Sequence, residues 1–153
     1  MAQNISHSIA NSEDVELAAL LCRSGSLCEG QSVRDINGFA NLSGKANSQI
    51  DSNLEDEVSV VVDFSSPQGL VERLNWCVAK DVPLMTGTTG LNEEELELLR
   101  KAGESIPVLL ASNTSLGVNA LRMLVRKLAS SLGSEYDVDI VESHHKWKKD
   151  RPS

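Results

Sequence analysis

The sequence predicts an α/β protein built around a parallel β-sheet. Between residues 58 and 111, short apolar segments alternate with amphipathic helical segments in the order strand, helix, strand, helix, strand. Each helical segment is long enough to serve as the crossover that parallel neighbouring strands require. Such βαβ units bring the carboxyl ends of all the strands to one edge of the sheet.

The composition is that of a folded, acidic chain. Its 153 residues are 41% hydrophobic and carry 22 acidic against 14 basic side chains, a formal net charge of −8. This length suffices to bury a core, no apolar run approaches a membrane span, and the acidic balance disfavours general nucleic-acid binding. The N-terminus lacks the pattern of a signal peptide. Three cysteines without metal-ligand spacing argue against both a disulfide framework and a metal site, so a cytoplasmic location is expected.

The charge is unevenly distributed along the chain. Residues 146–153 carry four basic side chains and one acidic side chain, a net charge of +3, which leaves −11 for residues 1–145. A basic tip on an acidic body indicates either a local anion-binding site or a solvated tail.

The elements before residue 80 follow from local signals. Residues 15–21 are predicted to form a short buried strand, and residues 24–57 mostly a loop with room for one short strand near its end. The β-branched run 58–64 is the clearest strand, and its almost continuous apolar character predicts cover on both faces. Ser66 as N-cap and Pro67 at the first helical position then start a helix that extends to about residue 79.

The alternation continues to residue 111. A strand at 83–86 is followed by a helix that starts at Asn92 with a capping box and closes at Gly103, and a third strand is expected at 106–111. Glutamates at 93–95 resemble a carboxylate site, but a solvated first helical turn explains them better because acids are favourable at a helix N-terminus.

The pattern changes after residue 115. Apolar positions from 121 to 132 predict a longer amphipathic helix that ends at Gly133. Residues 137–142 alternate polar and apolar side chains, which predicts a strand with one wet face. A second, α+β domain is therefore expected to begin here, and the predicted domains are 1–115 and 116–153.

Small polar residues follow each of the three central strands. These segments are 63–66 (DFSS), 87–90 (GTTG) and 112–115 (SNTS). Ligands of open parallel sheets bind beyond the carboxyl ends of the strands, and small side chains let the backbone approach a flat or phosphorylated ligand. One such loop is an ordinary turn. Three loops at one edge predict a ligand crevice.

A second candidate site lies at residues 143–150. His144 and His145 are adjacent and stand beside three lysines. Neighbouring side chains of an extended segment point in opposite directions, and no residue with zinc-ligand spacing lies nearby, so no metal is expected. Histidine with lysine can move protons near neutral pH and attract a carboxylate. The alternative is a solvated basic turn.

The sequence resembles the dihydrodipicolinate reductase (4-hydroxy-tetrahydrodipicolinate reductase) family in four ordered segments. These are VVVDFSSPQG, MTGTTGL, LLASNTSLGVN and DIVESHHKWKKDRPS. Four ordered motifs are more specific than one glycine-rich motif. The resemblance implies lysine and diaminopimelate biosynthesis, a Rossmann domain for NADPH or NADH at 1–115, and the beginning of a substrate and tetramerisation domain at 116–153.

The resemblance also implies roles for individual residues. His144 would be the proton donor and acceptor, Lys148 a proton donor, and His145 a contact to the substrate. The reaction would be hydride transfer from the nicotinamide to a cyclic unsaturated dicarboxylate. The cofactor would be held by two loops, made of Gly87, Thr88 and Thr89 and of Ala111, Ser112, Asn113 and Thr114.

The sequence departs from the family pattern at both ends. The family opens with a strand and a glycine-rich pyrophosphate loop, and neither precedes the helix predicted at 2–11. Cys22 stands where an acid would bind the adenosine ribose, and the following Arg23 favours a 2′-phosphate, hence NADPH. The family's Gly-Thr would follow Ser153. We therefore expect an incomplete Rossmann-type sheet, without its central first strand, and a chain that alone is poorly stable and inactive.

Other functions stay open at this point. One is a non-catalytic remnant that serves only as a binding or assembly module. Another is a phosphate- or nucleic-acid-binding domain that uses the basic tip with Trp147, although one aromatic residue in a basic octapeptide is weak support. The leading expectation is a dicarboxylate partner, with neither nucleic acid nor membrane. The sequence alone does not decide between NADH and NADPH, the oligomeric state, or whether the gene boundaries are correctly assigned.

Overall fold

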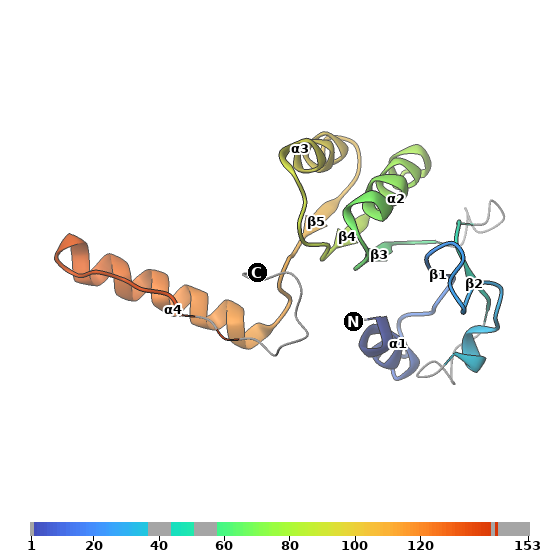
Figure 1. Ribbon diagram of the computed structural model, residues 1–153, viewed down its shortest axis with the longest axis horizontal. Helices are drawn as coiled ribbons and strands as arrows, with labels where there is room; N and C mark the ends of the chain where they lie inside the picture. Colours follow the sequence, from blue (N-terminus) through green and yellow to red (C-terminus); the bar gives the residue numbers. More distant parts are fainter. Residues whose placement is uncertain (1, 37–43, 51–57, 142, 144–153) are drawn as a thin grey trace.

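The computed structural model describes residues 2–36, 44–50, 58–141 and 143. The helices and strands follow one another in the order expected for βαβ units (Figure 1). They are α1 (Ala2–Ala10), β1 (Leu20–Leu21), β2 (Ala46–Asn47), β3 (Val61–Asp63), α2 (Pro67–Lys80), β4 (Leu84–Thr86), α3 (Glu93–Ala102), β5 (Val108–Leu110) and α4 (Leu116–Leu132). Short 3₁₀ turns occur at Val33–Asp35 and Gly133–Glu135.

The strands form two separate parallel sheets. Strand β1 pairs with β2, and β3, β4 and β5 form a three-stranded sheet in that order. This confirms the predicted α/β class. Among the described residues, β1 and β3 belong to different sheets and no strand pairing joins them. The strand predicted at 15–21 is much shorter than expected, because only its last two residues pair.

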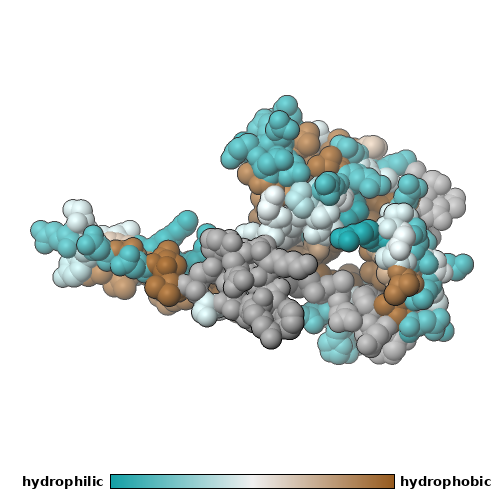
Figure 2. Space-filling model, in the orientation of Figure 1, coloured by the Kyte–Doolittle hydropathy of each residue, from teal (hydrophilic) through white to brown (hydrophobic). Residues whose placement is uncertain are grey.

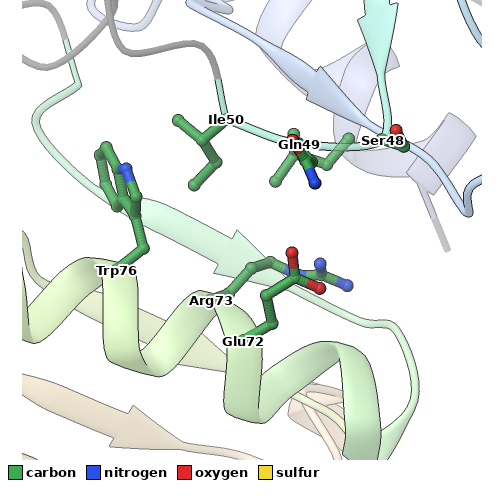
Figure 3. Close-up of a pocket in the computed structure, with 7 residues that line it drawn as sticks. Ser48, Gln49, Ile50, Glu72, Arg73 and Trp76 are labelled. Carbon is green, nitrogen blue, oxygen red and sulfur yellow. The ribbon is translucent and has the colours of Figure 1, made fainter.

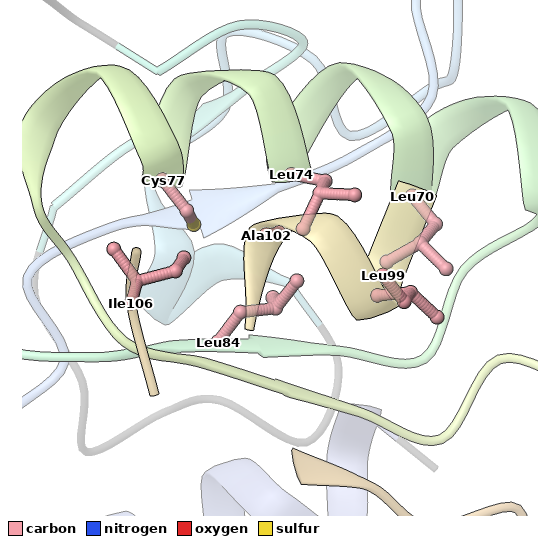
Figure 4. Close-up of a cluster of buried hydrophobic side chains, with 7 residues drawn as sticks. All are labelled: Leu70, Leu74, Cys77, Leu84, Leu99, Ala102 and Ile106. Carbon is pink, nitrogen blue, oxygen red and sulfur yellow. The ribbon is translucent and has the colours of Figure 1, made fainter. Parts of the chain in front are cut away.

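Helices α2 and α3 cover one face of the three-stranded sheet (Figure 1). Helix α2 starts as predicted, because the Ser66 hydroxyl accepts a hydrogen bond from the Gly69 amide. Helix α3 starts with the predicted capping box between Asn92 and Glu95. The core between these helices and the sheet consists of Leu70, Leu74, Cys77, Leu84, Leu99, Ala102 and Ile106 (Figure 4).

The other face of this sheet is open in the described part of the chain. Val62, Met85 and Leu109 lie opposite one another in register, on the face away from the buried Leu84. Val62 is 47% exposed and Leu109 is 58% exposed. The prediction that the strand at 58–64 is covered on both faces is therefore wrong for these residues. An apolar sequence shows that both faces of a strand could be buried. Whether they are buried depends on whether another layer of helices or strands packs on each face.

Helix α4 projects away from both sheets (Figure 1). Its predicted apolar stripe is present and ends at Gly133, whose φ of 74° suits glycine. Leu121, Leu124 and Leu128 are nevertheless 59–65% exposed. Figure 2 shows apolar side chains gathered along this helix. The apolar stripe of α4 has the composition of a surface that packs against another element. No element of the described residues packs against it.

The strand predicted at 137–142 is not observed. Residues 137–141 have no regular structure and are exposed, and residue 142 lies outside the described residues. A strand requires a neighbour to bond its N–H and C=O groups, and the described residues place none beside this segment. Among the described helices, none is both long and apolar enough to cross a lipid bilayer.

The two faces of the sheet should respond differently to the same substitution. Leu84→Ala, which opens a cavity at a side chain that is 1% exposed, should lower the free energy of unfolding by about 2–5 kcal/mol. Leu109→Ala on the open face should cost less than about 1 kcal/mol. Urea denaturation followed by circular dichroism measures both values. Equal costs would contradict an open face.

Candidate functional site at the carboxyl edge of the sheet

The three predicted loops leave the sheet at one edge. Asp63, Thr86 and Leu110 end their strands in register with one another. The Gly87 amide then donates to the Asp63 carbonyl at 2.8 Å, and the Ala111 amide donates to the Thr86 carbonyl at 2.8 Å. The juxtaposition of the loops is thus confirmed, while ligand binding between them stays a prediction.

A buried carboxylate organises this edge. Asp63 is 2% exposed and accepts hydrogen bonds from the Thr88 hydroxyl at 2.7 Å and from the Ser65 amide at 3.1 Å. The Ser65 hydroxyl donates at 2.9 Å, and the Arg73 guanidinium of α2 forms an ion pair with the opposite carboxylate oxygen. Burial alone would raise the pKa of Asp63, but these donors outweigh it and lower the pKa below its usual value.

The loop at residues 87–90 is held close to the sheet. Gly87 is buried, and a Cβ atom at this position would overlap the ring of Phe64. The Thr88 amide donates to the Thr86 hydroxyl at 3.2 Å, and the Thr88 side chain is 3% exposed. Thr89 is half-buried. Of the predicted cofactor residues here, Thr88 therefore turns its hydroxyl toward Asp63 and away from the surface.

The loop at residues 111–115 is mostly exposed, and its conformation is held by hydrogen bonds of asparagine side chains. Asn113 accepts a hydrogen bond from the Ser115 amide at 2.9 Å. The Asn119 side chain of α4 donates to the carbonyls of Asn113 and Ser115 at 3.0 and 2.9 Å. Ala111 is half-buried, and Ser112, Asn113 and Thr114 are exposed. The second predicted cofactor loop is thus accessible and adjoins the first at the sheet edge.

A pocket of about 200 Å³ lies between α2 and the segment after β2. Figure 3 shows Trp76, Arg73 and Glu72 on α2 and Ser48, Gln49 and Ile50 on the facing segment. Leu21 completes the lining. Sequence reasoning missed this pocket, because only the apolar stripe of α2 gave a signal. The spacing of Glu72, Arg73 and Trp76, which puts them on one helix face, is the sequence feature that could have indicated it.

The remaining predicted site residues do not lie in the two loops at the sheet edge or are not described by the structure. Arg23 is exposed, shortly after β1, and does not line the pocket. His144, His145 and Lys148 lie outside the described residues. Within the described ranges, no group of three potential metal-ligating side chains occurs, and all three cysteines are free thiols. Burial raises the pKa of the Cys77 thiol to about 11, so this thiol is protonated at neutral pH and forms part of the core.

A parallel sheet with loops of small residues at its carboxyl edge is the architecture of Rossmann-type α/β domains. The model of the family "Dihydrodipicolinate reductase, N-terminus" matches residues 1–114, and the model "Dihydrodipicolinate reductase, C-terminus" matches residues 117–153. The chain belongs to the dihydrodipicolinate reductase family.

Curated relatives named 4-hydroxy-tetrahydrodipicolinate reductase are similar over almost all of the chain. The protein of Pseudoalteromonas translucida is 37% identical over 153 residues, which are 100% of this chain and 56% of the relative. That of Zymomonas mobilis is 38% identical over 144 residues, which are 94% of this chain and 50% of the relative. The chain therefore spans about half the length of the curated relatives it matches.

The lowered pKa of Asp63 predicts a pH-dependent stability. The unfolded carboxyl titrates near pH 3.9, so the stabilisation by Asp63 is fully present well above that pH and is lost as the pH falls through the lower pKa of the folded state. Asp63→Asn should therefore lower the free energy of unfolding by about 1–3 kcal/mol at neutral pH, with the difference shrinking toward pH 3. Urea denaturation at a series of pH values measures this.

Asp81→Asn is the matched control for this experiment. Asp81 is exposed and has a φ of 56°, which asparagine also tolerates. At neutral pH this variant should stay within about 0.5 kcal/mol of the wild-type free energy of unfolding, because Asp81 is a surface residue. A constant difference between Asp63→Asn and wild type from pH 7 to pH 3 would contradict the assignment.

Proposed function

We propose that this chain supplies the dinucleotide-binding part, and the beginning of the substrate-binding part, of a 4-hydroxy-tetrahydrodipicolinate reductase. The observation that carries the proposal is the gathering of three small-residue loops at one sheet edge, in a chain of this family. The bound dinucleotide, NADPH or NADH, supplies a hydride for reduction of a cyclic unsaturated dicarboxylate. The protein acts in lysine and diaminopimelate biosynthesis in the cytoplasm.

The residues of the sheet edge fit the nicotinamide end of such a cofactor. Gly87 and its neighbours form a loop with little side-chain bulk above β4, and the exposed loop at 111–114 lies beside it. A flat ring can approach the backbone of the exposed loop at 111–114 closely. At the adenosine end, the exposed guanidinium of Arg23 suits a 2′-phosphate and favours NADPH. The proposed division of labour is therefore dinucleotide binding by residues 1–115 and substrate binding from residue 116 onward.

The basic segment after residue 143 is proposed to act on the substrate. His145 attracts a carboxylate of the substrate, His144 holds and moves a proton, and Lys148 donates the proton that completes the reduction. Cations in this segment also stabilise the anion that develops when the ring accepts a hydride. The excess of positive charge at this end of an otherwise acidic chain supports the assignment. Assembly into a homotetramer belongs to the same proposal.

Dinucleotide binding is the direct test. Titration of the purified chain with NADPH and with NADH, followed by nucleotide fluorescence, should show saturable binding that is tighter for NADPH. Gly87→Val should weaken binding at least about tenfold, because the added side chain displaces Phe64 and the loop. Gly117→Ala is the matched control, since a Cβ there meets no atom closer than 3.9 Å.

A measurement of turnover distinguishes an enzyme from a protein that only binds the dinucleotide. Without further segments, the 153-residue chain should bind the dinucleotide but not oxidise NADPH in the presence of the substrate. Joined to the remaining half of a relative, it should gain activity, and His144→Gln or Lys148→Met should then reduce turnover by about 100-fold or more without affecting folding. Absence of dinucleotide binding would refute the cofactor assignment, and full activity of either variant would refute its catalytic role.

A further inference from the structure

Thr88 is where the buried carboxylate meets the loop at residues 87–90. Its hydroxyl donates to Asp63 Oδ1 at 2.7 Å, across 25 residues of sequence, and its side chain is 3% exposed. A hydroxyl has one hydrogen to donate. Because Asp63 takes that hydrogen inside the protein, Thr88 does not donate it to a ligand in this conformation.

Asp63 is itself fixed relative to α2. Arg73 of this helix pairs with Oδ2, while Ser65 donates to the carboxylate from the loop after β3. The main chain adds a second attachment, because the Gly87 amide donates to the Asp63 carbonyl at 2.8 Å. The loop is therefore anchored to β3 by its backbone and to the Asp63–Arg73 pair by a side chain.

We propose that Asp63 is a positioning residue, which holds the loop at 87–90 in its binding conformation through Thr88 without touching the dinucleotide. This inference rests on the proposed function and deepens it. Thr88 stays in the loop that would hold the cofactor, and its side chain takes an indirect role there. The Asp63–Thr88 hydrogen bond then sets how much dinucleotide affinity the loop provides.

The proposal predicts a specific relation between variants. Thr88→Val keeps the side-chain shape and removes the hydroxyl, whereas Thr88→Ser keeps the hydroxyl. If Asp63 acts through Thr88, then Asp63→Asn and Thr88→Val should each weaken NADPH binding about tenfold, and the double variant should be no weaker than the single ones. Thr88→Ser should stay within about twofold of wild type. If Thr88 contacts the dinucleotide directly, Asp63→Asn should leave the affinity unchanged.

Hydrogen exchange of the ligand-free chain tests the positioning step without any nucleotide. Thr88→Val should speed exchange of the amides at 87–90 by about tenfold or more relative to those of α3, while Thr88→Ser should restore slow exchange. Leu99→Ala is the control for lost stability, because Leu99 belongs to the core on α3 and has no part in the loop. It should lower the unfolding midpoint, with unchanged NADPH affinity in the folded protein.

The outcomes distinguish this inference from the proposed function. Unchanged exchange at 87–90 in Thr88→Val would overturn the positioning role, whether or not the chain binds NADPH. Faster exchange with unchanged affinity, or additive losses in the double variant, would overturn the link to binding. Local acceleration in a chain that binds neither NADPH nor NADH would refute the proposed function and leave the structural role of Asp63 in place.

Discussion

The arrangement of the candidate site depends on one buried charge. A carboxylate that is 2% exposed is tolerable only if donors replace the water it has lost. At Asp63 these donors come from α2, from the loop after β3 and from the loop after β4. Satisfying one side chain therefore fixes the mutual position of a helix and two loops. The same network keeps the carboxyl ionised, because the donors lower its pKa despite burial.

Within the described residues, the three-stranded sheet is packed on one face only. Helices α2 and α3 provide a conventional core for one sheet face, while the opposite face and the stripe of α4 expose apolar side chains. The separation into two sheets leaves β3 with β4 as its one described strand neighbour. The chain spans about half the length of the curated relatives it matches.

The sequence predicted the helix ends well, because the interactions that end a helix involve residues close together in the chain. Ser66, Asn92 and Gly133 marked helix ends because capping depends on a few neighbouring atoms. The prediction of a strand at 137–142 was wrong for the described residues of this segment. A strand forms only beside a neighbouring strand, and an alternation of polar and apolar side chains does not show that such a neighbour exists. The predicted cover on both faces of the strand at 58–64 was wrong for another reason, since burial of the second face requires another packed layer and Val62 is exposed on that face. The network of Asp63 with Arg73 and Thr88 was missed, because its partners are 10 and 25 residues away and each resembles an ordinary turn or helix residue.

A double-mutant cycle between Asp63 and Thr88 tests the central claim most directly. The free energies of unfolding of wild type, Asp63→Asn, Thr88→Val and the double variant give the coupling between the two side chains without assumptions about a ligand. A charged, buried hydrogen bond should yield a coupling of about 1–3 kcal/mol. A coupling within error of zero would show that the two residues act independently, and would contradict a site organised by this carboxylate.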